Sequence, residues 1–323
     1  MNNRTAADDL DPPVQKAAQC LRNGGLVAFP TETVYGLGAD ATNDKAVARI
    51  FEAKARPRFN PLIVHVADPT AAAAIAVWSD LADELASRFW PGPLSLILER
   101  KDGAQISPLV SAGGKTIALR APKHPLAEAL LREAALPVAG PSANPAGRIS
   151  PTTAAHVEAG LGERVDMILD GGPCKVGVES TVLDLTGDHA LLLRPGGLSR
   201  RDLEAVIGKP ILSPRQQADQ DKDLRSPGRL LSHYAPNHRL RLNAKDVEAD
   251  EALLAFGRHS IEGAAITLNL SRSGDMVEAA ANLFSMLHRL DREDVRQIAV
   301  MPIPKTGLGE AIWDRLTRAA APR

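Results

Sequence analysis

Cysteines, aromatic residues and long apolar runs are all scarce in this chain of 323 residues. The two cysteines, Cys20 and Cys174, lie far apart in the sequence, which excludes a disulfide scaffold, a Cys-x-x-Cys redox pair and a cysteine-based zinc site. The longest unbroken apolar run covers only residues 71–78, so no segment is long enough to span a membrane. The polar, acidic amino terminus is unlike a signal or transit peptide, and we expect a cytoplasmic protein.

Neither sign of charge is in excess. The 38 Lys and Arg residues balance 39 Asp and Glu residues, giving a net charge of −1. This balance disfavours a generally basic nucleic-acid-binding protein, although it allows a local basic cleft. Aromatic residues make up 3% of the chain, which argues against binding of single strands by base stacking.

One long segment is poor in apolar residues. Residues 213–229 contain only Ala218 and Leu224 as apolar members, too few to pack against a core, so we interpret the segment as part of a linker. The sequence therefore predicts a larger domain over residues 1–208, a linker over 209–236 and a smaller domain over 237–323.

Short apolar runs alternate with amphipathic stretches in both domains, which predicts an α/β fold. In the larger domain we expect strands at 26–30, 62–66, 94–98, 116–119, 182–185 and 190–193, and helices at 44–55, 79–89, 124–134 and 152–159. In the smaller domain we expect strands at 253–256, 265–270 and 297–301, with helices at 276–290 and 308–320. These elements predict a small doubly wound domain, while the pattern leaves open whether the larger sheet is parallel or mixed.

Three familiar motifs match only in part. The glycines of residues 36–41 come six residues after the predicted strand, too late for a dinucleotide-binding turn. Residues 114–116 resemble the end of a P-loop but precede a strand instead of a helix, and residues 140–144 lack the last glycine of a nucleophile elbow. His233 and His238 have no acidic or cysteine neighbour in the sequence, so we expect surface residues and no metal site.

Polar residues gather instead in turns beside the predicted strands. The turn at residues 30–38 is either a tight connection or a hydroxyl-lined ligand loop, and the cations of residues 54–58 either complement a helix end or bind an anion. Four cations, Lys54, Arg56, Arg120 and Arg194, lie at loop or strand ends. If the fold brings them together, they suit a polyanionic ligand such as a triphosphate.

Seven segments occur in the order found in a known family. They include PTETVYGLGADA, KARPRFNPLIVHV and AGPSANPAGRISPT, and they resemble the YrdC-like L-threonylcarbamoyladenylate synthases. The segment SPGRLLSHYAP resembles the linker of the long form, although residues 229–231 depart from its usual pattern. The resemblance implies a twisted, largely mixed sheet with a concave basic site, followed by a smaller Rossmann-like α/β domain.

The resemblance also implies an activity. Such enzymes join L-threonine, bicarbonate and ATP into threonylcarbamoyl-AMP and pyrophosphate, with Mg²⁺ bridging the phosphates and no protein ligand to the metal. A separate transferase complex passes the threonylcarbamoyl group to adenosine in tRNA. We expect weak direct tRNA binding at most. Two other functions remain open, an RNA-binding module that uses the same cleft and a different carbamoyl-transfer enzyme.

Site residues follow from the matching positions. The resemblance assigns to L-threonine the residues Thr31, His65, Arg120, Gly140 and Ser180. It assigns to ATP the residues Lys54, Arg56, Asn60, Thr116, Ser142, Ser150, Arg194 and Tyr234. Lys54, Arg56, Ser142 and Asn144 form the catalytic signatures, with Asn144 supporting the network. Tyr234 would let the linker act as a lid over the nucleotide.

Overall fold

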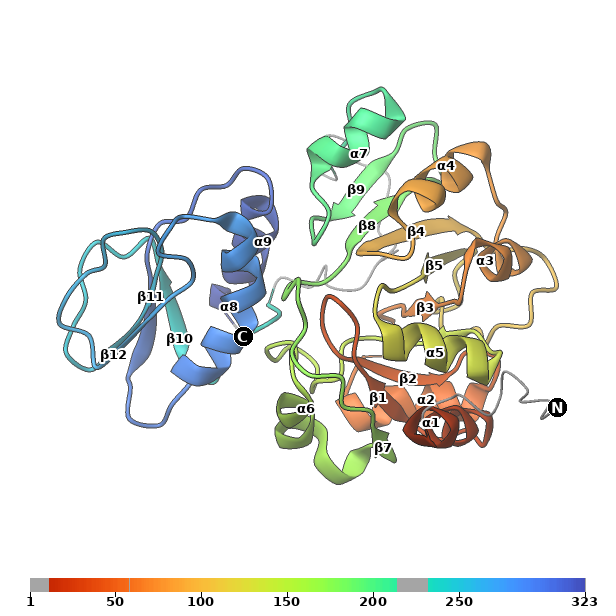
Figure 1. Cartoon of the computed structure of the whole chain (residues 1–323), viewed down its shortest axis with the longest axis horizontal. Helices are drawn as coiled ribbons and strands as arrows, with labels where there is room; N and C mark the ends of the chain where they lie inside the picture. The colour runs from red at the N-terminus through yellow and green to blue at the C-terminus, as the bar shows by residue number, and fades with distance from the viewer. Residues whose placement is uncertain (1–11, 58, 214–231, 323) are drawn as a thin grey trace, which may run out of the picture.

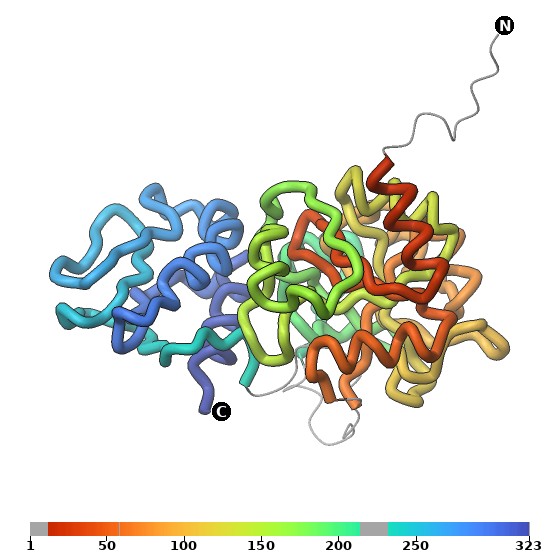
Figure 2. The backbone as a smooth tube through the Cα atoms, turned by 90° about the horizontal axis from the view of Figure 1, so that it is seen from below, coloured from red at the N-terminus to blue at the C-terminus, as the bar shows by residue number. Residues whose placement is uncertain are grey.

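The computed structural model describes residues 12–57, 59–213 and 232–322. These residues form two α/β bodies, each built on its own sheet (Figure 1). Figure 2 shows the smaller body beside one end of the larger one. Among the described helices, none has the length and apolar character needed to cross a membrane.

The larger body contains nine strands and seven α-helices in the described residues. Their bounds in chain order are α1 (Pro12–Arg22), β1 (Val27–Phe29), β2 (Gly36–Asp40), α2 (Asp44–Lys54), β3 (Ile63–His65), α3 (Pro69–Ile75), α4 (Asp80–Phe89), β4 (Leu94–Glu99), β5 (Thr116–Arg120), α5 (Pro125–Ala134), β6 (Val138–Ala139), α6 (Ala154–Leu161), β7 (Met167–Ile168), β8 (Thr181–Asp184), β9 (Leu191–Arg194) and α7 (Arg200–Ile207). A short 3₁₀ turn, Gly162–Arg164, follows α6.

The larger sheet is mixed. Its strand order is β7-β1-β2-β6-β3-β5-β4-β8-β9. β3 runs parallel to β5 and β4 parallel to β8, whereas β4 and β5 are antiparallel. The mixed sheet expected from the family resemblance is therefore confirmed.

The smaller body has a four-stranded sheet in the order β10-β13-β11-β12, in which every pair is parallel. Its elements are β10 (Arg239–Leu242), β11 (Glu251–Ala255), β12 (Ile266–Asn269), α8 (Met276–Leu290), β13 (Gln297–Val300) and α9 (Gly309–Ala320). Both helices carry an apolar stripe that buries Leu283, Leu287 and Leu316. This parallel arrangement confirms the Rossmann-like domain.

Every helix and strand predicted from the sequence is present, with ends that move by a few residues. Asn43 caps α2 by accepting bonds from Lys45 N and Ala46 N. The helix ends at Lys54, because Ala55 turns into the left-handed region at φ 49°. The sequence missed α1, α3 and α7 and the strands β2, β6, β7 and β10.

β2 shows why a strand was overlooked. Its glycines are required by close packing, since a Cβ on Gly36 would lie 3.1 Å from the Phe29 ring and one on Gly38 would lie 3.0 Å from it. Glycine disfavours a strand in propensity terms, so the segment was predicted to be a loop. Its position inside a strand also confirms that residues 36–41 are not a dinucleotide-binding turn.

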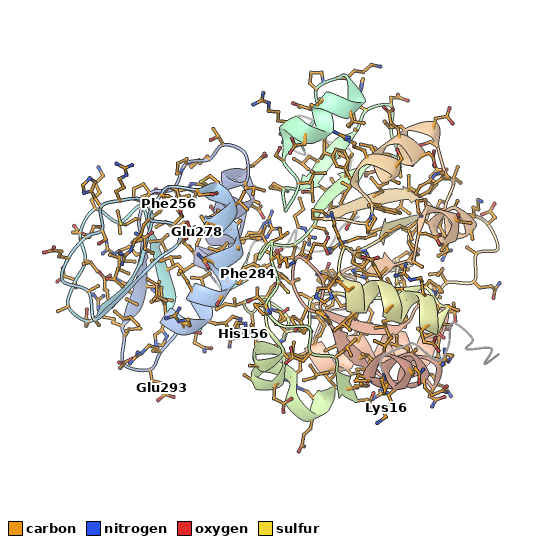
Figure 3. The ribbon with its side chains drawn as sticks, in the orientation of Figure 1. Lys16, His156, Phe256, Glu278, Phe284 and Glu293 are labelled. Atoms are coloured by element: carbon orange, nitrogen blue, oxygen red, sulfur yellow. The ribbon has the colours of Figure 1, made fainter. Side chains whose placement is uncertain are left out.

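The two bodies share one apolar cluster. Val34, Ile149 and Val178 of the larger body pack with residues of α8 and α9. The Tyr234 ring stacks 5.7 Å from that of Phe284 on α8, and the His156 ring stacks 4.0 Å from that of His288. Figure 3 labels one member of each pair, Phe284 in the smaller body and His156 in the larger one. Most of the predicted linker, residues 214–231, lies outside the described residues.

Candidate active site

A cavity of about 50 Å³ lies on one face of the larger sheet. Nine of the residues selected from the sequence line it: Thr31, Arg56, His65, Arg120, Gly140, Ser142, Ser180, Arg194 and Tyr234. The structure thus brings Arg56, Arg120 and Arg194 together from three separate segments. The sequence alone did not show that these cations meet, and in the structure three of the four do.

The pairing of β3 with β5 brings two polar residues to the cavity wall. β3 and β5 are parallel and in register, so that His65 pairs with Arg120 at the end of both strands. Ala118 and Arg120 share one face of β5, whereas Ile117 and Leu119 enter the main core on the other. Side-chain alternation along β5 therefore directs the Arg120 guanidinium group into the cavity.

His65 is neutral and partly unsatisfied. A Cβ on Gly140 would lie 2.7 Å from His65 Nδ1, so only glycine leaves room for this ring position. Burial lowers the pKa of His65 to about 3, with a further contribution from the Arg120 charge. The ring makes a hydrogen bond to the backbone of Val138, while Nδ1 has no partner among the described residues. A buried lone pair therefore faces Gly140 at the cavity wall.

Arg120 has an acidic partner. Its Nη2 atom lies 2.8 Å from Glu32 Oε2 in a pair that is almost fully buried, and its Nε donates to the Gly92 carbonyl at 3.2 Å. Two buried carboxylates, Glu32 and Glu179, therefore lie near the cations that the sequence suggested for an anionic ligand. One oxygen of this pair, Glu32 Oε1, has no hydrogen-bond partner within the described part of the chain.

Arg56 and Arg194 bind backbone carbonyls. Arg56 donates to Asn60 O at 3.3 Å and Pro61 O at 3.0 Å, and Arg194 donates to Ser180 O at 2.9 Å. Burial lowers the pKa of Arg56 to about 10 and also lowers that of Arg194. Neither cation has a carboxylate at hydrogen-bond distance in the part of the chain that the structure describes, which favours an anionic ligand.

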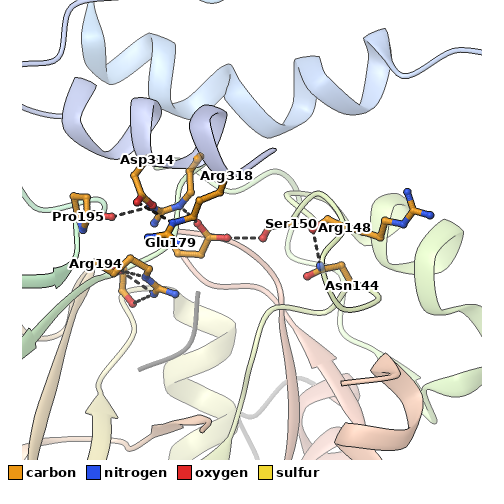
Figure 4. A network of polar contacts seen from close by, with 10 residues as sticks. Asn144, Arg148, Ser150, Glu179, Arg194, Pro195, Asp314 and Arg318 are labelled. Carbon is orange, nitrogen blue, oxygen red and sulfur yellow. Dashed lines mark hydrogen bonds and ion pairs between the residues drawn. The ribbon is translucent and has the colours of Figure 1, made fainter. Parts of the chain in front are cut away.

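Lys54, Asn144 and Ser150 do not line the cavity. Lys54 Nζ donates to the carbonyl oxygens of Ser142 and Asn144, and burial lowers its pKa well below the ordinary value. The Asn144 amide donates to Pro145 O and Arg148 O, each at 2.9 Å. The Ser150 hydroxyl donates to Glu179 (Figure 4). These three side chains hold the loop that carries Ser142.

Asn60 and Thr116 also lie away from the cavity. Thr116 begins β5 and Arg120 ends it, so they are about 13 Å apart at the usual rise of a strand. Thr116 lines a second hollow of about 770 Å³, together with Pro61 and Ala118. This hollow adjoins the cavity, because Ala118 pairs with Ile63 on the cavity wall. Asn60 is buried and contributes its carbonyl to Arg56.

Comparison with known proteins identifies the family. A family described as "Telomere recombination" (Sua5, YciO and YrdC proteins) matches residues 19–196, and one described as "Threonylcarbamoyl-AMP synthase, C-terminal domain" matches residues 198–321. The chain belongs to the Sua5 family. Threonylcarbamoyl-AMP synthase of Bacillus subtilis (strain 168) is 44% identical to it, over 97% of this chain and 94% of that protein. The enzyme of that name from Pyrococcus abyssi is 40% identical, over 96% and 94%.

Solved structures of the Sua5 family agree in fold. The crystal structure of P. abyssi Sua5 complexed with L-threonine superposes with a TM-score of 0.87 at 37% identity, covering 95% of this chain and 94% of that one. The likeness extends over both bodies. The two-domain long form expected from the motifs is therefore confirmed for this chain.

Sequence reasoning missed four residues around this Sua5-family cavity: Glu32, Glu179, His233 and Arg315. His233 is buried and lines the cavity, contrary to the expected surface position, and His238 has an acidic partner, Asp291, at 2.8 Å. The sequence carried one signal for Arg315, which shares its helix face with the buried Ala311 and Ala319. A charged residue on an apolar face of a helix indicates a buried partner.

Proposed function

We propose that this chain is an L-threonylcarbamoyladenylate synthase, a nucleotidyltransferase that converts L-threonine, bicarbonate and ATP into threonylcarbamoyl-AMP and pyrophosphate. One observation carries this proposal: Arg56, Arg120 and Arg194 line a single cavity together with the hydroxyl-bearing residues Thr31, Ser142 and Ser180. Such a cavity suits an amino acid beside a phosphate chain. The Sua5 relatives that carry this activity in their names match nearly the whole chain.

We place threonine at the end of β3 and β5. Arg120 offers a planar pair of N–H groups to the carboxylate, a geometry that lysine cannot match. His65 Nδ1 offers a lone pair to the amine or the hydroxyl of the substrate. Thr31 and Ser180 complete the pocket, although the Thr31 hydroxyl already donates to Val34 O at 2.6 Å and acts first as a brace of its own turn.

The nucleotide occupies the other side of the cavity and the adjoining hollow. Arg56, Ser142 and Arg194 would face the phosphates, while Asn60 and Thr116 lie towards the hollow. Lys54, Asn144 and Ser150 act by holding the backbone of the Ser142 loop. A cavity of about 50 Å³ is far smaller than a nucleotide pocket. Tyr234 and His233 line it, so we propose that this segment moves aside as a lid when ATP enters.

The chemistry requires positioning more than a protein nucleophile. The neutral threonine amine and bicarbonate form a carbamate with loss of one water molecule. A carbamate oxygen then attacks the α-phosphorus of ATP, forming a new P–O bond as the α–β bridge breaks and pyrophosphate leaves. Cys174 takes no part, since burial raises the pKa of its thiol to about 12.

Mg²⁺ would enter with the nucleotide. No group of three His, Cys, Asp or Glu side chains in the described residues could hold a metal ion. The carboxylates nearest the phosphate cations are engaged, Glu179 by Arg315 and Glu32 by Arg120. The ion would therefore be bound by phosphate oxygens, where it neutralises charge. We further propose that the chain acts in the cytoplasm and that its product serves a tRNA transferase complex.

The test is release of pyrophosphate from ATP, measured with and without L-threonine and bicarbonate. We expect release only when both are present, and incorporation of label from bicarbonate into an adenylate. Arg56→Ala and Arg120→Ala should each lose turnover while the proteins keep their folded circular dichroism spectra. Salt-sensitive tRNA binding without turnover would instead support the RNA-binding alternative. Equal activity with other amino acids would contradict the assignment of threonine.

A further inference from the structure

Arg315 extends from the smaller body into the wall of the cavity. It lies on α9 and is fully buried, yet its Nε donates to Glu179 Oε2 at 2.7 Å and its Nη1 to Pro195 O at 2.9 Å, both in the larger body. Nη1 also donates to Asp314 Oδ2 at 2.7 Å. Figure 4 shows Glu179 between Ser150 and the side chains of α9. One side chain of the smaller body thus binds two segments that border the cavity.

These two segments carry residues proposed to bind substrates. Glu179 precedes Ser180, and Pro195 follows Arg194. The segments cross so closely that a Cβ on Gly196 would lie 2.4 Å from Glu179 O. A displacement of one segment is therefore transmitted to the other. Arg315 fixes the pair at the point where they meet.

Glu179 has two cations within its electrostatic reach. Burial alone would raise its pKa, but the charges of Arg315 and Arg194, together with the hydrogen bonds from Ser150 and Arg315, hold the pKa below the ordinary value. Among the described residues, only Arg315 makes an ion pair with it, whereas Arg194 donates to the carbonyl and the hydroxyl of Ser180. The other carboxylate oxygen accepts the Ser150 hydroxyl. Glu179 is thus satisfied without Arg194.

A buried carboxylate that loses its cation either takes up a proton or draws another cation to itself. Without Arg315, the cation among the described residues whose charge still acts on Glu179 is Arg194. An Arg194–Glu179 pair would cancel the charge that is proposed to face the phosphates. The role of Arg315 would then depend on the charge it neutralises more than on the contacts it makes.

We propose that Arg315 is a positioning residue through which the smaller domain controls nucleotide binding. It occupies Glu179 and so keeps Arg194 free for a phosphate group. This inference rests on the proposed function, because it assumes a nucleotide beside Arg194. It gives the smaller domain a part in the reaction although the domain lies outside the substrate pockets.

The test compares the full-length wild type with Arg315→Met and the double variant Arg315→Met/Glu179→Gln, by initial rates at varied ATP and varied threonine. For Arg315→Met we expect the KM for ATP to rise about tenfold or more, with the KM for threonine within about twofold of wild type. In the double variant no unpaired carboxylate remains, so the KM for ATP should return to within about threefold of wild type.

Arg200→Met is the matched control. Arg200 of α7 pairs with Glu310 of α9 at 3.1 Å, so this variant removes another ion pair between the bodies, one that lies away from the cavity. We expect unchanged KM values. Should Arg315→Met fail to fold, Arg315→Lys keeps the charge and loses the bond to Pro195, and it should retain a KM for ATP near that of wild type.

Two outcomes would overturn the inference. If the double variant is as impaired as Arg315→Met, the arginine serves only in docking the domains. If Arg315→Met binds ATP as well as the wild type, Glu179 does not compete for Arg194. Neither outcome affects the proposed function, which fails only if the wild type itself makes no threonylcarbamoyl-AMP.

Discussion

Lys54 donates a hydrogen bond from its Nζ atom to the carbonyl oxygen of Ser142, 88 residues further along the chain. A second bond from the same atom reaches the Asn144 carbonyl. The amine is buried and its pKa is lowered, chiefly by burial. The lysine of one sequence motif therefore holds the backbone of the other.

Lys54→Met should lose both stability and activity. It leaves two carbonyl oxygens without a donor in a buried position, at a cost of about 1–3 kcal/mol of unfolding free energy. Turnover should fall because Ser142 loses its fixed position. Denaturant titration and initial rates measure the two effects. Lys101→Met is the control, since the exposed Lys101 amine also donates to a backbone carbonyl, that of Ala73, and we expect little change. A fully stable Lys54→Met would contradict the bracing role.

The local sequence pattern located many residues of this site, but it did not predict for every one of them whether its side chain faces the cavity. The alternation of β5 placed Arg120 on the cavity face because side chains in a strand alternate between faces. Lys54 and Arg56 come from the same short motif, yet only Arg56 lines the cavity. The partner of Lys54 is a loop 88 residues away, and nothing in the local pattern specifies that pairing.

The Glu179–Arg315 ion pair, which links the two bodies, could not be predicted from the sequence for the same reason. Glu179 and Arg315 are 136 residues apart, and although the helix pattern around Arg315 indicates a buried partner, nothing in it specifies Glu179. Their pairing depends on how α9 docks, which is decided by the apolar cluster around Val178 and Tyr234. How distant segments pack against each other depends on the tertiary fold. Ion pairs between such segments are therefore seen only in the structure.

Arg120→Lys should weaken threonine binding selectively. Lysine keeps a positive charge beside Glu32 but cannot offer two parallel N–H groups to a carboxylate. We expect the KM for threonine to rise by roughly tenfold, with the KM for ATP unchanged. Arg22→Lys, at a surface pair with Glu133, should alter neither value. An equal loss of ATP and threonine affinity would argue that Arg120 serves the whole cavity.

Stability should fall as the pH drops below about 6.5. Burial lowers the pKa of His65 and of His233 to about 3 each, so below pH 6.5 the unfolded chain binds protons that the folded chain does not. Unfolding is then favoured, by up to about 1.4 kcal/mol per pH unit for each histidine. Denaturant midpoints at pH 7.5, 6.5 and 5.5 measure the slope. His233→Gln should flatten it, whereas the exposed His259→Gln should not.

Tyr234→Phe should stabilise the fold and at the same time weaken ATP binding. Tyr234 is buried at a positive φ of 62°, and its hydroxyl lines the cavity without a hydrogen-bond partner in the described residues. Unusual backbone angles of this kind are typical of functional sites. Removing an unsatisfied hydroxyl should raise the unfolding free energy, by about 1 kcal/mol at most. If that hydroxyl binds the nucleotide, the KM for ATP should rise several-fold.

The chain contains only one other tyrosine, and it provides the control. The Tyr35 hydroxyl donates to Gly172 O at 2.8 Å and accepts from Gly171 N at 3.1 Å, so Tyr35→Phe leaves a carbonyl and an amide without this partner. It should lose about 1–2 kcal/mol of stability and keep its KM for ATP. The two variants therefore move stability in opposite directions, and only the one at the cavity affects the nucleotide. A Tyr234→Phe enzyme with wild-type KM would show that its ring, and not its hydroxyl, contributes to the site.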